Sequence, residues 1–300
     1  MAAVAAVLFA IGYLVSNTLS NLEARRIASG FGFLGREAGF EIGESFFLRY
    51  GAADSYLRAL VVGLVNTLMV AAIGIVLATG LGTAIGLFRL SGNFLLRTLS
   101  TAYVEFVRNV PLLVQLFFWY ALITEGLPSP RDALSPLPGV FLTNRGLFFP
   151  DFSGVPELQG FNFAGGGALS PEFAALWIGL SVYTAAFIAE IVRAGVMAVV
   201  RGQWEAARAV GLSERHVLRY VIAPQALRVI VPPLTSQYLN LTKNSSLAVA
   251  IGYPDLVSIA NTTINQTGQA IEGIAIIMAV YLSISLAISA LMNWYNARLR

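Results

Sequence analysis

Two charged patterns within otherwise apolar sequence are the first residues whose spacing suggests a chemical role. Glu105 and Arg108, and likewise Glu190 and Arg193, place an acid and a base three residues apart. On a helix this spacing puts both groups on one face, where they can neutralise each other. We expect the four residues to form an ion-pair cluster shared between two helices. Static pairs that only make buried charge tolerable are the competing interpretation.

A second group of polar side chains lies within residues 236–246, again surrounded by apolar sequence. Polar groups in lipid are costly unless they face protein or water, so these residues are candidates for lining a transport path. The path candidates are Gln237, Asn240, Lys243, Asn244 and Ser245, with Asn109 and Gln115 from an earlier segment. Lys243 could attract a carboxylate, pair with an acid of another protein, or extend to an interface.

Several kinds of catalysis are excluded by what the sequence lacks. It contains no cysteine, and His216 is its single histidine, so neither thiolate chemistry nor a histidine metal cluster is expected. It also lacks the glycine-rich loop ending in Gly-Lys-Ser/Thr that binds nucleotide phosphates. We therefore expect no catalytic residue, no metal site and no ATP hydrolysis by this chain.

The composition places the chain in a membrane. The sequence is 57% hydrophobic and 12% charged, with a mean hydropathy of +0.72, whereas soluble domains are roughly 25% charged. The net charge is only +3, and the arginines stand singly at the ends of apolar runs. This placement sets membrane topology and gives no basic face for nucleic acid.

Apolar runs long enough to cross a bilayer define the expected elements. The spans are residues 59–88 and 273–297, which are free of charge, three less uniform runs, 98–123, 172–200 and 225–250, and an N-terminal run over 1–15. The prediction is an all-α integral membrane protein with about six transmembrane helices. Pro111 is expected to kink its span.

Arginine placement predicts the orientation of these spans. The short segments 89–97 and 201–228 and the C-terminus are rich in arginine, so they are expected on the cytoplasmic side. Segments 21–58, 125–171 and 251–270 then face outward. We expect residues 1–58 to form an N-terminal helix with an outward segment, and residues 59–297 to form the main domain. The proline and glycine of loop 125–171 predict irregular backbone.

The cytoplasmic segment 202–224 carries the most informative motif. A short helix is expected over 203–210, closed by Gly211 in the left-handed conformation. A second is expected over 214–220, with Ser213 as its N-cap and Pro224 beyond its end.

This segment resembles the EAA signature of ABC importer permeases, in which Glu-Ala-Ala precedes a glycine and a hydrophobic triplet with proline. Glu205, Ala206, Ala207, Gly211 and Pro224 occupy the corresponding positions, and Ala223 stands where leucine is usual. The resemblance implies short cytoplasmic coupling helices that dock on an ATPase subunit. An ordinary amphipathic interfacial helix is the alternative.

Further stretches extend the resemblance to permeases of polar and general L-amino acid importers: NTLMVAAIG, YVEFVRNVPLLVQLFFWY, YTAAFIAEIVRAGV and LTKNSSLAVAIGYPDL. The resemblance implies a five-helix type I core, in the bacterial inner membrane, that translocates L-amino acids. It also implies ABC ATPase subunits that carry ATP and Mg²⁺, a second and non-identical permease chain, and a periplasmic amino-acid-binding protein. No cofactor is implied for this chain.

Two other classes of protein compete with this interpretation. An ion-coupled secondary transporter needs coupling carboxylates near the middle of the bilayer and often has inverted repeats. The two charged patterns here resemble each other as a repeat would, but the rest of the helices that carry them do not match. A membrane scaffold would need no polar residues inside its spans. The secondary transporter also gives the segment at 202–224 no purpose.

Overall fold

The computed structural model describes residues 2–24, 29–45, 47–152 and 154–299. Its α-helices are α1 (Ala2–Ala24), α2 (Tyr56–Phe88), α3 (Phe94–Asn109), α4 (Leu112–Gly126), α5 (Pro171–Met197), α6 (Arg201–Ala209), α7 (Glu214–His216), α8 (Ala223–Asn244), α9 (Leu256–Thr267) and α10 (Ala270–Leu299). Its strands are β1 (Leu134–Leu137), β2 (Val140–Thr143), β3 (Gly146–Phe149), β4 (Glu157–Gln159), β5 (Asn162–Ala164) and β6 (Gly167–Leu169).

The helices that are long and apolar enough to span a membrane number four among the described residues, or five if the bent pair α3 and α4 counts as one span. The four are α2, α5, the run Glu214–Ile251 that contains α8, and α10. A helix does form at the N-terminus as expected, but α1 is not one of these, so a count of six spans is not confirmed.

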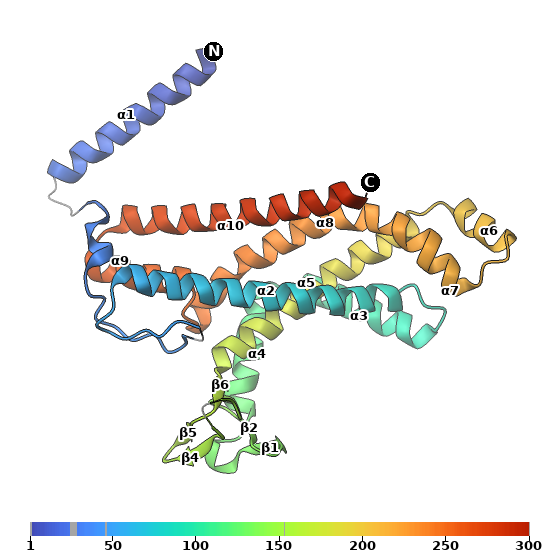
Figure 1. The fold of residues 1–300 in the computed structure, drawn as a ribbon, viewed down its shortest axis with the longest axis horizontal. Coiled ribbons are helices and arrows are strands. Elements are labelled where there is room, and N and C mark those ends of the chain that lie inside the picture. The colour runs from blue at the N-terminus through green and yellow to red at the C-terminus, as the bar shows by residue number, and fades with distance from the viewer. Residues whose placement is uncertain (1, 25–28, 46, 153, 300) are drawn as a thin grey trace.

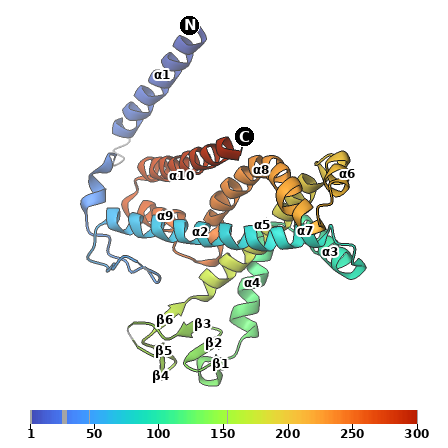
Figure 2. The ribbon, with the colours of Figure 1, turned by 45° about the vertical axis from the view of Figure 1, so that its right-hand side comes forward.

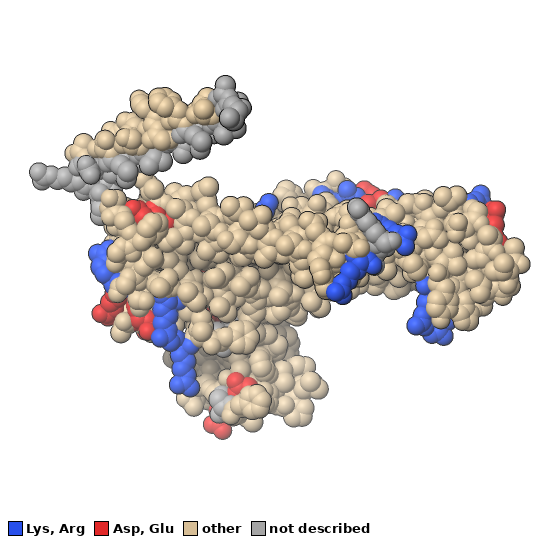
Figure 3. All heavy atoms as spheres, turned by 45° about the horizontal axis from the view of Figure 1, so that its top comes forward, with Lys and Arg blue, Asp and Glu red and all other residues tan. Residues whose placement is uncertain are grey.

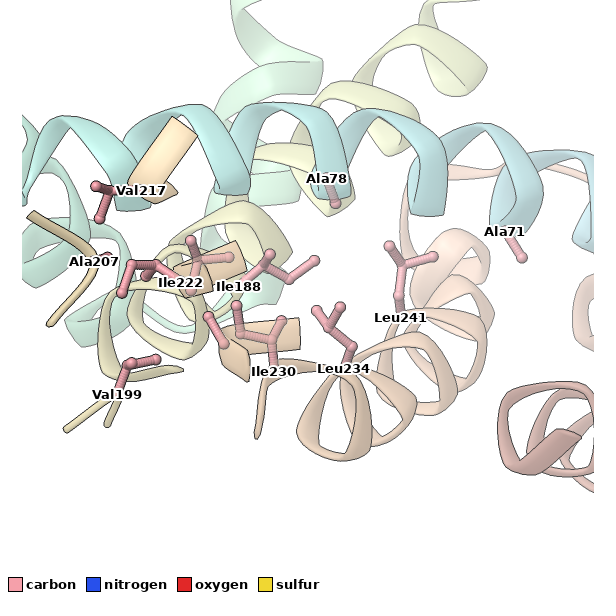
Figure 4. Packing of buried hydrophobic residues seen from close by; sticks show 12 residues of the cluster. Ala71, Ala78, Ile188, Val199, Ala207, Val217, Ile222, Ile230, Leu234 and Leu241 are labelled. Carbon is pink, nitrogen blue, oxygen red and sulfur yellow. The ribbon is translucent and has the colours of Figure 1, made fainter. Parts of the chain in front are cut away.

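Helices α2 and α5 pack at the centre of the molecule because glycines on α2 allow close approach. A Cβ added at Gly82 would lie 2.7 Å from Ile188 Cβ, and one added at Gly86 would lie 2.7 Å from the carbonyl oxygen of Ala189. Ile188 belongs to a buried cluster that also includes Ala78 of α2 and Leu241 of α8 (Figure 4). Small residues at helix contacts are a common means of packing in lipid.

The span expected over 98–123 is two helices. Chain direction changes by 106° between α3 and α4, where Val110 is extended and Pro111 precedes the first residue of α4. Proline removes a backbone donor and restricts the residue before it, so the helix ends here. Pro111 therefore breaks the span instead of kinking it.

The segment expected as an outward loop over 251–270 contains α9. Asp255 caps this helix by accepting a hydrogen bond from the Ser258 amide at 2.8 Å. Gly252 and Gly268, at φ +82° and +73°, make the tight turns on either side. The two turns allow α9 to fold back against α2 and α10.

Loop 125–171 is more ordered than its proline and glycine content predicts. A four-stranded antiparallel sheet runs in the order β1-β2-β3-β6, and β4 pairs with β5 as a separate hairpin. Phe141 and Phe163 stack with ring centroids 4.3 Å apart, which joins the sheet to the hairpin. Gly139, at φ +76°, supplies the turn between β1 and β2. We call residues 134–169 the β subdomain.

In space, α2 and α10 run along the length of the molecule, with α6 and α7 at one end and α9 at the other (Figure 1). The β subdomain projects to one side at the ends of α4 and α5, and α1 stands apart from the bundle (Figures 1 and 2). On the face shown in Figure 3, charged atoms lie at the α9 end and over the part of the bundle from the C-terminus to α6, and the stretch between these two regions is largely uncharged.

Candidate functional site

The motif segment begins with α6, which is held against the bundle by one face. Ala207 is 4% exposed and packs in the same buried cluster as Val217 and Ile222 (Figure 4). Glu205 and Ala206 are exposed on the other side of the helix. The helix thus presents an acid and a small residue to whatever lies beyond this end of the molecule.

Gly211 turns the chain after α6. Its φ is +80°, and its amide donates to the carbonyl of Arg208 at 2.9 Å. An ion pair between Arg208 and Glu214, 2.7 Å apart, closes the same turn. The left-handed glycine predicted at this position is therefore present, and it fixes the angle between α6 and α7.

The second half of the segment differs from the prediction in two respects. Ser213 precedes α7 but makes no side-chain cap; its hydroxyl bonds His216 Nδ1 at 2.7 Å. Pro224 lies in the first turn of α8 and not beyond a helix end. A π-helical turn, Val217–Ile222, joins α7 to α8, so the motif continues without a break into a span.

An ion-pair group lies at the same end of the bundle. Arg193 contacts Glu190 on α5 at 2.5 Å, and Arg89, which follows α2, also pairs with Glu190. The side chain of Arg89 is 9% exposed and that of Glu190 is 30% exposed. Two cations therefore share one carboxylate, and the pairs tie α2 to α5.

The pair expected between Glu105 and Arg108 does not form among the described residues. Both side chains are exposed on α3, and the Arg108 guanidinium lies 5.1 Å from the ring centroid of Phe187. The break at Pro111 makes α3 a short peripheral helix, so its outer face is not covered. In place of the expected four-residue cluster, Glu190 pairs with Arg89 and Arg193. The sequence signal for Arg89 was its position directly after the uncharged run 59–88.

The polar residues of α8 form a stripe along one face. Asn240 and Lys243 are exposed at helical spacing, and Gln237 and Asn244 flank them half-buried. Ser245 is buried and donates to the Thr242 carbonyl at 2.7 Å. Lys243 has no carboxylate partner within the described residues, so its charge is free to meet a group outside this chain.

The two path candidates from the earlier segment have local roles. Gln115 is buried, and its amide donates to the carbonyls of Val107 and Val110 at 2.9 and 3.0 Å, which the break at Pro111 leaves unpaired. Asn109 is exposed and donates to the Glu105 carbonyl at 2.7 Å. The structure does not bring either residue into the α8 stripe.

The α9 end holds a polar pocket that the sequence did not single out. Asn66 donates to the carbonyls of Glu44 and Pro254, both at 2.9 Å, and so joins two connecting segments. Glu44 also accepts from the Ser170 amide at 3.0 Å, and it lines a cavity of 450 Å³ with Glu41 and others. A lone glutamate in a long connection gives no recognisable signal.

Burial controls the protonation of the carboxyl groups at this end. It raises the pKa of Glu44 to about 6, against the lowering effect of the hydrogen bonds from Ser170. Burial likewise raises the pKa of Asp255 to about 6, although the amide of Ser258 opposes the shift. Within the residues that the structure describes, no group of three or more His, Cys, Asp or Glu side chains could hold a metal ion.

Several membrane-length apolar helices packed together, with a polar helical segment continuous with one of them, define a multi-span membrane protein. The chain belongs to the family described as "Binding-protein-dependent transport system inner membrane component", whose profile matches residues 73–300. It is a transporter permease subunit, and in these systems ATP is hydrolysed on separate subunits.

Named relatives agree with this family. The chain is 49% identical to the "Putative amino-acid ABC transporter permease protein YhdX" of Escherichia coli, with 99% of this chain and 92% of that protein covered. It is 43% identical to the "General L-amino acid transport system permease protein AapQ" of Rhizobium johnstonii, with 96% and 88% covered. Among solved structures, one titled "Crystal structure of an amino acid ABC transporter with histidines" matches at 28% identity and a TM-score of 0.62, covering 81% of this chain and 95% of that chain.

Proposed function

We propose that the chain is the membrane-spanning subunit of an ABC importer that carries L-amino acids across the bacterial inner membrane. The observation that carries the proposal is the motif segment. One face of α6 packs in the core through Ala207, the other face is exposed, and Gly211 in the left-handed conformation fixes the turn after the helix. The names of the relatives above support amino acids as substrates. The core is residues 59–297, and an N-terminal segment over residues 1–58 precedes it.

The motif segment acts as a lever on the spans. Glu205 and Ala206 dock on an ATPase subunit, which binds ATP and Mg²⁺, and Ala207 transmits the force into the core. Because α7, the π-helical turn and α8 are continuous, movement of α6 relative to α5 reaches the α8 stripe. π-Helical turns are frequent at functional sites in helices. This end of the molecule is the cytoplasmic one, as the arginines predict.

The α8 stripe faces the amino-acid path. Asn240 and Lys243 are exposed in a membrane-length helix, which is costly unless water or protein covers them. A second, related permease chain supplies the opposite wall, and the unpaired ammonium of Lys243 attracts the substrate carboxylate. If this is correct, Lys243→Gln raises the KM for uptake and leaves the thermal stability unchanged. An unchanged KM would contradict the role of Lys243.

A periplasmic binding protein delivers the amino acid at the α9 end. The β subdomain contributes to that contact, because Phe152 and Phe161 are strongly exposed on it. Exposed aromatic side chains are typical of protein interfaces. Deletion of residues 130–150 is expected to weaken binding of that protein, and unchanged affinity would remove the β subdomain from the contact.

Uptake in cells tests the proposed substrate class. Cells that carry the intact gene cluster are compared with cells in which the permease gene alone is deleted, using a panel of labelled L-amino acids. Uptake of several amino acids is expected to disappear on deletion and to return when the gene is supplied. If uptake of every amino acid on the panel is unchanged by deletion, the proposed substrate class is wrong.

A further inference from the structure

A cavity that the proposed transport function does not use lies between the motif segment and the spans. It has a volume of about 730 Å³, and most of its lining is apolar. Leu87 comes from the last turn of α2, and Leu90 follows directly after that helix. Trp204 comes from α6, and Leu218 comes from the π-helical turn. The cavity is therefore placed at the joint across which α6 must act on the bundle.

Charge at one side of this cavity is positive and unpaired. Arg215 and Arg219 line it four residues apart, and neither has a carboxylate partner within the described residues. The carboxylates nearest in sequence are already engaged: Glu214 pairs with Arg208 at 2.7 Å, and Glu205 lies 4.0 Å from Arg201. Both arginines are exposed, and Arg219 also lies 5.6 Å from the ring centroid of Tyr220. No carboxylate of the described residues neutralises them, so both are available to an anion from outside this chain.

The position of the cavity fixes the chemistry of its occupant. Leu87 and Leu90 flank Arg89, where the uncharged run of α2 ends, so the cavity lies at the boundary between hydrocarbon and water. Apolar walls on the membrane side and unpaired arginines on the water side match an acyl chain attached to a phosphate. Basic pockets between helices at the cytoplasmic boundary suit anionic lipid head groups.

We propose that this cavity binds an anionic phospholipid of the inner leaflet, with its phosphate on Arg215 and Arg219 and an acyl chain against Leu87, Leu90 and Trp204. The lipid bridges α6 and the π-helical turn to the end of α2. It thereby stiffens the joint, so that coupling of ATP hydrolysis to transport depends on anionic lipid. The dependence of coupling on lipid rests on the proposed function, but the binding of the lipid does not.

Quenching of tryptophan fluorescence tests the binding without any transport assay. In a full-length chain with Trp119, Trp177 and Trp294 replaced by phenylalanine, Trp204 is the one remaining tryptophan. The protein is placed in phosphatidylcholine vesicles that contain brominated phosphatidylglycerol or, at the same fraction, brominated phosphatidylcholine. Stronger quenching by the anionic lipid is expected. Equal quenching by both lipids would mean ordinary surrounding lipid and would overturn the proposal.

Variants identify the anion site. Arg215→Gln or Arg219→Gln is expected to reduce the preference for phosphatidylglycerol about fivefold, the usual effect of one basic residue near a membrane surface. Arg97→Gln removes an exposed arginine from α3 that does not line the cavity, and it should keep the preference. A loss of preference in all three variants would mean a general surface charge effect and would contradict a specific site.

The assembled complex provides the decisive control, because a partner subunit could fill the same cavity. Phospholipid retained by the purified complex is counted by native mass spectrometry for wild type, the Arg215→Gln/Arg219→Gln double variant and Arg97→Gln. Loss of retained phosphatidylglycerol only in the double variant is expected. Equal retention in all three complexes would show that lipid does not occupy the cavity beside the partner, and would overturn the proposal whether or not the complex transports amino acids.

Discussion

The guanidinium of Arg89, at the end of α2, donates to the carboxylate of Glu190 on α5. Because Arg193 also contacts this carboxylate, Glu190 balances two cations near the motif segment. The exposure of the Arg89 side chain is only 9%. Removing the carboxylate thus leaves a largely buried cation without a partner, which is far more costly than losing an exposed pair.

Glu190→Gln is accordingly expected to destabilise the protein by about 2 kcal/mol, allowing for the partial exposure of the carboxylate. The thermal midpoint of the purified permease in detergent measures this effect. The control is Glu105→Gln, which changes an exposed carboxylate without an ion pair in the described structure. Uptake per inserted molecule separates two interpretations of the ion pairs. Static pairs predict loss of yield alone, whereas a cluster that holds the inner mouth together and rearranges when it opens predicts loss of uptake at equal yield.

Because α2 packs closely on α5, replacing Gly82 and replacing Gly80 by alanine should change the stability of the protein differently. Gly82→Ala places a Cβ 2.8 Å from the Ala185 carbonyl oxygen, so the helices must separate, at a cost of about 1–3 kcal/mol. Gly80→Ala meets no atom within 4 Å and should be neutral or slightly stabilising. Thermal unfolding of both variants tests this difference. Equal midpoints would mean that α2 and α5 do not approach at Gly82.

Adjacent alanines of the motif separate docking from core packing. Ala206→Arg adds a bulky cation to an exposed face, so we expect the ATPase subunit to bind more weakly while the thermal midpoint of the permease is unchanged. Ala207→Leu overfills a buried position and should lower the midpoint, at a cost of about 1–3 kcal/mol. Copurification of the ATPase and thermal unfolding are measured side by side. A stable Ala207→Leu variant together with an unstable Ala206→Arg variant would reverse the assignment of the two faces.

Long apolar runs predicted four of the expected spans, because lipid requires every backbone group in such a run to bond within its own helix. The left-handed conformation of Gly211 was also predicted, because few residues other than glycine adopt positive φ. A proline can either kink a helix or end it, so the sequence did not reveal that Pro111 ends one completely. Residues 256–267 were expected only as part of an outward segment, because a run this short cannot span a membrane. Arg89 replaced Glu105 and Arg108 in the ion-pair group because tertiary contacts, and not helical spacing, decide which charges meet.

Glu44 gives the α9 end a dependence on pH. Its pKa is raised by burial from 4.5 to about 6, so the folded protein binds more protons than the unfolded chain between these values, and stability falls as pH rises through this window. Above pH 6 the full cost of about 1–2 kcal/mol applies. Glu44→Gln should therefore raise the thermal midpoint in mildly alkaline buffer but not in acidic buffer below the ordinary pKa of a glutamate.

The matched control for this prediction is Glu41→Gln, which changes an exposed carboxylate that lines the same cavity. Its thermal midpoint should follow that of wild type in both buffers. If Glu44→Gln is destabilising in alkaline buffer, the carboxylate is ionised and satisfied in the folded protein, and burial does not control its protonation.

Uptake by Gly211 variants tests the coupling role of the motif segment most directly. A Cβ at Gly211 meets no atom within 4 Å, so only its φ of +80° restricts the residue type. Asparagine tolerates this conformation and valine does not. With equal amounts of permease in the membrane, Gly211→Asn should retain most of the ATP-dependent uptake of labelled L-amino acids and Gly211→Val should lose it. Wild-type uptake by Gly211→Val would contradict a rigid coupling segment that transmits ATPase movement to the spans.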